Sequence, residues 1–241
     1  MPNILERTVR ELAVDVPGAT RVFEELGIDY CCGGGRSLVD ACFAAGISLE
    51  QATAALEAGK ERYSREGDGS WQSRSLTDLI EHIVRRHHEY TKSELQRLDQ
   101  LSTKVVSVHG QNHPELNELR ERFLELRNDL LPHMMKEERV LFPYIEQLEA
   151  ATKAGRPAPS PLFGTARNPI MMMIREHDGA GELLRELRTA SRDYVVPDDG
   201  CVSYRALYDA LRELEQDLHQ HIHLENNILF PRTVALEGAI H

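Results

Sequence analysis

Two stretches of this chain carry the same motif, H-x-x-x-E-x-x-x-L-F-P, from His133 to Pro143 and again from His221 to Pro231. In each copy the histidine and the glutamate continue a row of apolar residues, nearly all leucine, spaced alternately three and four residues apart, which is one face of an α-helix. The motif therefore points a histidine and a carboxylate, one turn apart, toward the interior. Such a placement needs a partner, because buried charges are normally paired or bound to a metal.

Two further helical patterns each contribute one inward histidine. The first runs over about 76–106, begins at the capping-box-like pair Ser75 and Asp78, and places His87 on the same face as Ile80 and Ile83. The other begins at Asn168-Pro169 and ends near residue 194, and its apolar stripe includes His177. The two motif helices cover about 115–148 and 203–235. With hardly any strand signal, the chain is predicted to be all-α, with a four-helix bundle over 76–241.

The first 63 residues lack the long helical patterns of the bundle. Residues 1–63 contain short amphipathic runs separated by DVPG and CCGGGRS, which predict a small helical N-terminal domain. Residues 64–75 are polar and contain glycine, so they are expected to form a linker. The vicinal pair Cys31-Cys32 precedes three glycines, and adjacent cysteines rarely form an unstrained disulfide. The pair could bind a metal transiently, carry NO or exchange thiols, or it could be two ordinary cysteines at a helix end.

The inward polar residues of the bundle have the composition of a metal site. Four imidazoles and two carboxylates are too many ligands for one tetrahedral zinc ion and suit two metal ions bridged by the carboxylates. Nitrogen and oxygen donors with open positions favour non-haem iron, with manganese next. The six predicted ligands are His87, His133, Glu137, His177, His221 and Glu225.

The remaining histidines of these helices, and a proline beside one predicted ligand, are interpreted separately. His88 has no support from the stripe, and His219 and His223 lie off it, so all three are expected at the surface. Pro132 directly precedes His133 and predicts that the second helix bends or restarts there, because proline removes a helical hydrogen bond.

Composition excludes several classes of protein. A net charge of −11 disfavours nucleic acid as a partner, because an acidic surface repels phosphate. No apolar run approaches the roughly 18 residues of a membrane span, and the N-terminus lacks the apolar region of a secretory signal. Four cysteines are too few for a disulfide scaffold, so a cytoplasmic location is expected.

The segments HMMKEE…LFP, REHD and HIHLENNILFP, preceded by DYCCGGG, together resemble the repair-of-iron-centres family of iron–sulfur cluster repair di-iron proteins. This resemblance implies a hemerythrin-like bundle joined to a small domain with a vicinal Cys-Cys. It implies two iron ions, with Glu137 and Glu225 as bridging carboxylates and an oxo bridge, and a redox or transfer role for Cys31 and Cys32. It also suggests a homodimer, and it draws interest to Glu176 as a carboxylate beside a ligand.

The resemblance implies that the protein repairs iron–sulfur clusters damaged by nitrosative or oxidative stress, by donating iron from the di-iron site. Its partners would then be damaged or apo iron–sulfur proteins, with NO or O₂ as small ligands. Two alternatives stay open: a di-iron nitric oxide reductase that produces nitrous oxide, and an O₂ carrier or sensor. The carrier fits less well, because it has no need of Cys31-Cys32 and would favour a site saturated with histidine.

Overall fold

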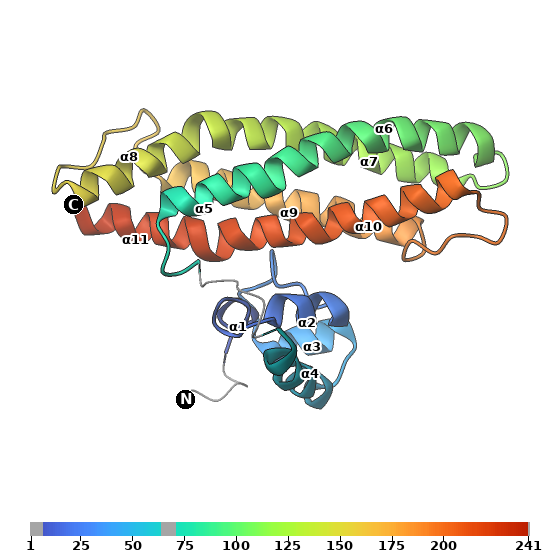
Figure 1. Cartoon of the computed structure of the whole chain (residues 1–241), viewed down its shortest axis with the longest axis horizontal. Coiled ribbons are helices and arrows are strands. Elements are labelled where there is room, and N and C mark those ends of the chain that lie inside the picture. Colours follow the sequence, from blue (N-terminus) through green and yellow to red (C-terminus); the bar gives the residue numbers. More distant parts are fainter. Residues whose placement is uncertain (1–6, 64–70, 241) are drawn as a thin grey trace.

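The structure is a computed structural model that describes residues 7–63 and 71–240. Four short helices form a small unit beside a long bundle (Figure 1). The short helices are α1 (Val9–Asp15), α2 (Ala19–Leu26), α3 (Leu38–Ala45) and α4 (Leu49–Tyr63). The predicted linker over 64–75 lies partly outside the described residues, and its described part leads from Trp71 into the bundle.

The bundle consists of four rods, three of which contain a short π-helical turn. In chain order the elements are α5 (Leu76–His82), η2 (Ile83–His88) and α6 (Glu89–His109); α7 (Glu115–Lys136), η3 (Glu137–Leu141) and α8 (Phe142–Lys153); α9 (Arg167–Ala190); and α10 (Val202–His223), η4 (Leu224–Leu229) and α11 (Phe230–Ile240). The all-α fold expected from the sequence is confirmed in the part of the chain that the structure describes. Helix α7 continues through Pro132, so it does not restart there.

The three π-helical turns decide which side chains face inward. Each closes with a backbone bond across five residues: the N–H of Glu89, Phe142 or Phe230 donates to the carbonyl of Val84, Glu137 or Glu225. A π-helical turn holds one extra residue, so every later position moves by about one place around the helix. In an unbroken α-helix Val140 would face inward, three residues after Glu137, but it is 48% exposed, whereas Leu141 is 1% exposed. The π-helical turn η3 therefore puts Leu141 rather than Val140 on the inward face.

The motif itself favours two of these turns. Pro143 and Pro231 end the two copies, and proline has no N–H to give the carbonyl four residues earlier. The wider turn lies just before each proline, where the α-helical ladder is already interrupted. The first rod forms η2 without a proline, so its local sequence does not predict the π-helical turn.

The apolar core of the bundle lies in two clusters with polar residues between them. One cluster extends from Leu130, Met134 and Leu218 toward the α6–α7 connection. The other surrounds Leu141 and Phe230 and fills the opposite end. The polar belt between the clusters contains the inward residues of both motifs, so the packing holds this belt at the middle of the bundle and shields it on two sides.

The small N-terminal unit has its own core and is seated on the bundle. Phe23, Tyr30 and Leu38 are buried within it. The carboxylate of Glu24 contacts His219 Nδ1 at 3.0 Å, and Gln220 donates to the Tyr30 hydroxyl at 2.7 Å. These contacts place the unit against α10 (Figure 1), and a bond from Asn227 to the carbonyl of Tyr30 joins it to η4. None of the helices within 7–63 and 71–240 is both long enough and apolar enough to cross a membrane.

Candidate metal centre

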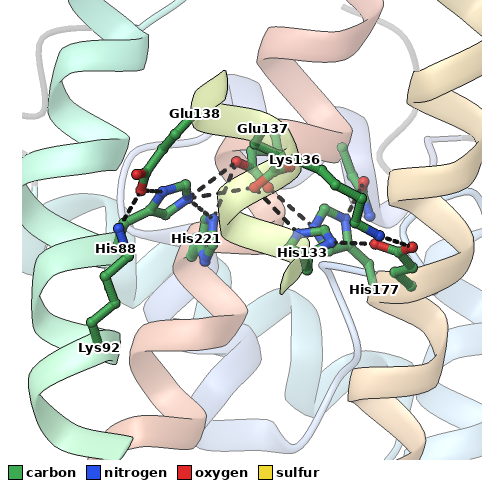
Figure 2. Close-up of polar contacts among 11 residues, drawn as sticks. His88, Lys92, His133, Lys136, Glu137, Glu138, His177 and His221 are labelled. Carbon is green, nitrogen blue, oxygen red and sulfur yellow. Dashed lines mark hydrogen bonds and ion pairs between the residues drawn. The ribbon is translucent and has the colours of Figure 1, made fainter. Parts of the chain in front are cut away.

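Six buried side chains in the polar belt form two groups that share both glutamates. One group is His88, Glu137, His221 and Glu225, and the other is His133, Glu137, His177 and Glu225. Within each group the potential ligand atoms all lie within 4.8 Å of one another. Each rod of the bundle supplies a histidine, and the two motif rods add the glutamates, as Figure 2 shows for the labelled residues.

The four imidazoles face one another in two pairs, each through its Nε2 atom. His88 Nε2 lies 3.0 Å from His221 Nε2, and His133 Nε2 lies 3.0 Å from His177 Nε2. Glu137 Oε2 is 3.5 Å from His88 Nε2 and 3.3 Å from His133 Nε2, so this carboxylate reaches both pairs. Glu225 also reaches both pairs. Its Oε1 lies 3.1 Å from His221 Nε2, and its Oε2 lies 3.1 Å from His177 Nε2.

The two carboxylates are buried without a hydrogen-bond donor. Both side chains are fully buried, and neither oxygen of Glu137 or Glu225 accepts a hydrogen bond from any described group. Burial and the nearby Glu225 raise the pKa of Glu137 well above its usual value. Burial also acts against the charge of Glu225, but the imidazoles of His221 and His177 hold its pKa below the usual range. A cation between the glutamates would satisfy both at once.

The outward nitrogens of three imidazoles are held by hydrogen bonds. Glu138 lies 2.7 Å from His88 Nδ1, Glu176 lies 2.8 Å from His133 Nδ1, and Asn226 Oδ1 lies 2.9 Å from His177 Nδ1. With Nδ1–H donating outward, the lone pair of each Nε2 faces the centre, which is the tautomer that metal binding requires.

Two lysines complete the shell around these bonds. Lys92 pairs with Glu138 at 2.6 Å, and Lys136 pairs with Glu176. The hydrogen bond from His88, helped by Lys92, lowers the pKa of Glu138 to about 2, and His133 with Lys136 does the same for Glu176. Both carboxylates therefore stay charged at neutral pH and keep their histidines oriented (Figure 2).

The residues present fit a pair of metal ions. Each group offers two imidazole nitrogens and two shared carboxylates, and this nitrogen and oxygen set suits iron or manganese. The buried carboxylate oxygens are the observation that decides the fit, since no described group donates a hydrogen bond to them and the groups that face them are the Nε2 atoms of the four imidazoles.

Comparison with known proteins agrees with this geometry. Residues 79–233 match the family described as the hemerythrin HHE cation binding domain, and residues 5–60 match a domain of unknown function. The chain is 37% identical to the iron–sulfur cluster repair protein YtfE of Dickeya chrysanthemi (strain Ech1591), over 97% of this chain and 98% of the relative.

Other relatives match over the same span. YtfE of Cronobacter sakazakii (strain ATCC BAA-894) is 36% identical, over 96% of this chain and 98% of its own. A probable iron–sulfur cluster repair protein of Haemophilus influenzae is 34% identical, over 96% of this chain and 98% of its own. The chain belongs to the iron–sulfur cluster repair protein family. The resemblance inferred from the motifs is thereby confirmed, together with the hemerythrin-like character of the bundle.

One expected ligand is not where the sequence placed it. The structure brings His88 to the centre and leaves His87 outside both groups. His87 Nδ1 instead faces Asp217 at 3.1 Å, and its ring is stacked on that of His221 at 5.8 Å between centroids. The reason is the π-helical turn η2, whose extra residue moves the inward position from 87 to 88. The candidate ligand of the first rod is corrected accordingly.

Other functional residues escaped the sequence pattern because their roles depend on long-range contacts. Glu138 and Asn226 follow the glutamates of the two motif copies, and this shared position is the one signal that could have revealed them. His223, expected at the surface, is 4% exposed, because the N-terminal unit covers it and Asn227 bonds its Nδ1 at 2.8 Å. His219, also expected at the surface, is partly buried and contacts Glu24 of the N-terminal unit.

The vicinal cysteines lie against the centre. Cys32 Sγ is 3.6 Å from the backbone oxygen of His177, and the two thiols are 3.7 Å apart and unbridged. Contact with Cys32 and burial raise the pKa of Cys31. Glycine is required at position 34, because a Cβ there would lie 2.9 Å from the carbonyl of Tyr30. Gly34 thus lets this loop fold back closely on itself.

Metal removal is expected to destabilise the protein. A ligand that binds only the folded chain at about a hundred times its dissociation constant adds about 2.7 kcal/mol. For a chain of this size that corresponds to a Tm shift of roughly 5–10 °C. Scanning calorimetry with and without a strong chelator measures the shift, and an unchanged Tm would contradict the presence of a metal in the folded protein.

A second prediction concerns the thiol of Cys201, at the far end of α10 from the centre. Cys201 precedes α10, and the backbone N–H of Tyr204 and the nearby His109 ring, 3.1 Å from its sulfur, lower its pKa to about 7. We expect Cys201, which is exposed, to react with iodoacetamide before the other cysteines, with a midpoint near pH 7. Peptide mass spectrometry against pH tests this, and His109→Ala should move the midpoint upward. Faster labelling of Cys32 would contradict it.

Proposed function

We propose that the chain holds two iron ions between its two histidine pairs and donates iron to iron–sulfur proteins damaged by nitrosative or oxidative stress. The observation that carries this proposal is the pair of buried glutamates without hydrogen-bond partners, shared between four imidazoles. The names of the relatives, iron–sulfur cluster repair proteins, supply the class of client.

Different residues of the centre would bind the metal and orient its ligands. Bound iron would supply a transferable, redox-active ion. Glu137 and Glu225 would bridge the two ions, and His88, His133, His177 and His221 would complete the donor set. Glu138 and Glu176 keep two imidazoles oriented, and the apolar clusters on either side limit access of water.

Cys31 and Cys32 are proposed to receive iron as it leaves. The loop that carries them lies against the backbone of His177, so the thiols are the nearest soft ligands on the side of the N-terminal unit. Asp29 Oδ1 lies 3.5 Å from Cys31 Sγ, and these three residues offer a second, smaller group of donors. Such a group can hold an ion in transit without competing with the main centre.

A combined measurement tests the proposal. The purified protein should contain close to two irons per chain and show near-ultraviolet bands of a bridged di-iron centre. Incubated with an apo-ferredoxin, sulfide and a thiol, it should lose iron as the ferredoxin gains a cluster. A chain that carries one zinc or no metal would overturn the proposal.

The cysteine role is tested by the variant Cys31→Ala with Cys32→Ala. It should keep its iron and transfer it more slowly, whereas the matched variant Cys201→Ala should transfer at the wild-type rate. Equal rates for all three proteins would remove Cys31 and Cys32 from the transfer step.

Nitric oxide reduction is the alternative that the donor set also supports. Four protein donors around each position leave coordination sites for small ligands on six-coordinate iron. Repeated turnover to nitrous oxide with a reductant, and no loss of iron to the apo-ferredoxin, would favour the reductase over the donor.

A further inference from the structure

Asn226 contacts the candidate centre with one end of its amide and the cysteine loop with the other. Its Oδ1 lies 2.9 Å from His177 Nδ1, and its Nδ2 donates to the backbone carbonyl of Cys31 at 3.3 Å. The side chain is buried. A single planar amide thus joins a candidate metal ligand of the bundle to the N-terminal unit.

The equivalent residue in the other half of the bundle makes only the first of these contacts. Glu138 and Asn226 occupy the same place in the two motif copies, directly after the shared glutamates. Glu138 holds His88 Nδ1, as Asn226 holds His177 Nδ1, but the same Glu138 oxygen, Oε1, also accepts a hydrogen bond from Lys92. A carboxylate accepts only, so the asparagine gives this half a donor that the other half lacks.

The carbonyl of Cys31 determines which way the amide faces. A carbonyl can only accept, so it selects the orientation in which Nδ2 points to the loop and Oδ1 points to His177. Oδ1 in turn accepts from Nδ1–H of His177 and leaves the Nε2 lone pair for the metal. Without the loop, nothing in this pair of contacts prevents the amide from turning its donor end toward His177.

The loop is held in place by other bonds that do not involve Asn226. Asn227 Nδ2 donates to the carbonyl of Tyr30 at 2.9 Å, and Arg10 Nε donates to Asn227 Oδ1 at 2.7 Å. Gln220 adds the bond to the hydroxyl of Tyr30. Docking can therefore be weakened without touching the contact between Asn226 and His177.

We propose that Asn226 is a positioning residue that couples docking of the cysteine loop to retention of the metal at His177. The docked loop fixes the amide, the amide fixes the imidazole, and undocking of the loop loosens both. Because such coupling is reciprocal, bound metal also strengthens docking. The inference rests on the metal centre of the proposed function and not on its transfer step.

The test is a double-mutant cycle on the full-length, iron-loaded protein, read as the rate at which a chromogenic iron(II) chelator removes iron. Asn226→Ala should speed release about tenfold or more, the range found when such outer partners are lost. Asn227→Ala, the adjacent matched change, should speed release less, through docking alone. Its effect should vanish in the Asn226→Ala background. Should Asn227→Ala fold poorly by circular dichroism, Tyr30→Phe takes its place.

A second readout tests the reciprocal effect without measuring iron. In a Cys201→Ser background, bound iron should slow labelling of Cys32 by a maleimide in the wild-type loop, and the slowing should be lost with Asn226→Ala. Independent, multiplying effects of Asn226→Ala and Asn227→Ala on release, or equal labelling with and without iron, would overturn the coupling while leaving the centre intact. A wild-type chain that retains no metal would overturn both the coupling and the proposed function.

Discussion

Replacing His88 with alanine is expected to remove at least one of the two metal ions, whereas replacing its neighbour His87 is expected to leave both in place. His88 Nε2 faces the centre beside His221 and Glu137, and Glu138 fixes its orientation. Loss of an orienting partner alone typically costs 10–100-fold in affinity, so loss of the ligand should cost more. Metal content per chain, measured by mass spectrometry after dialysis, gives the result directly.

His87→Ala is the matched control, because it removes an imidazole from the adjacent position of the same helix. Its contact with Asp217 contributes to stability but not to the donor set, so a modest loss of about 1 kcal/mol is expected, with metal retained. The opposite result, metal lost with His87→Ala and kept with His88→Ala, would mean that the helix keeps α-helical register through 83–88 and that the centre is built on His87.

The contrast between these neighbours explains how far the sequence could predict the site. His133 and Glu137 lie before the extra residue of η3 takes effect, as His221 and Glu225 do for η4, so their α-helical spacing holds. His88 ends η2, and Leu141 ends η3, where spacing has already shifted by one place. Helical periodicity fails only where the helix stops being an α-helix.

The rest of the site could not be predicted because it depends on contacts between distant parts of the chain. The repeat revealed the bundle and its two halves, since the histidine and glutamate of each copy replace residues of a leucine stripe. It could not show that the N-terminal unit covers His223 and Asn227 or brings Cys32 to His177. No periodic signal records those contacts, because loops and neighbouring surfaces make them.

Glu137→Gln is expected to have effects of opposite sign on the metal-free and metal-loaded proteins. Without metal, folding buries a carboxylate beside Glu225 and raises its pKa well above 4.5. Such a group destabilises the fold as the pH rises above its unfolded pKa, because the unfolded chain releases the proton more readily. Glutamine removes this penalty, so the metal-free variant should be more stable near pH 7, by about 1–3 kcal/mol.

With metal, the same change should lower stability, because Glu137 belongs to both donor groups and a neutral amide binds a cation more weakly than a carboxylate. Urea denaturation of both forms at pH 5 and pH 7 tests the pair of signs. The stability gain of the metal-free variant should shrink toward pH 5, where the wild-type carboxyl costs less. Glu138→Gln serves as the neighbouring control: its charge is already paired with Lys92, so it should give no gain in the metal-free protein. A metal-free Glu137→Gln that is less stable than wild type at pH 7 would mean that hydrogen bonds or a retained cation already satisfy this carboxylate.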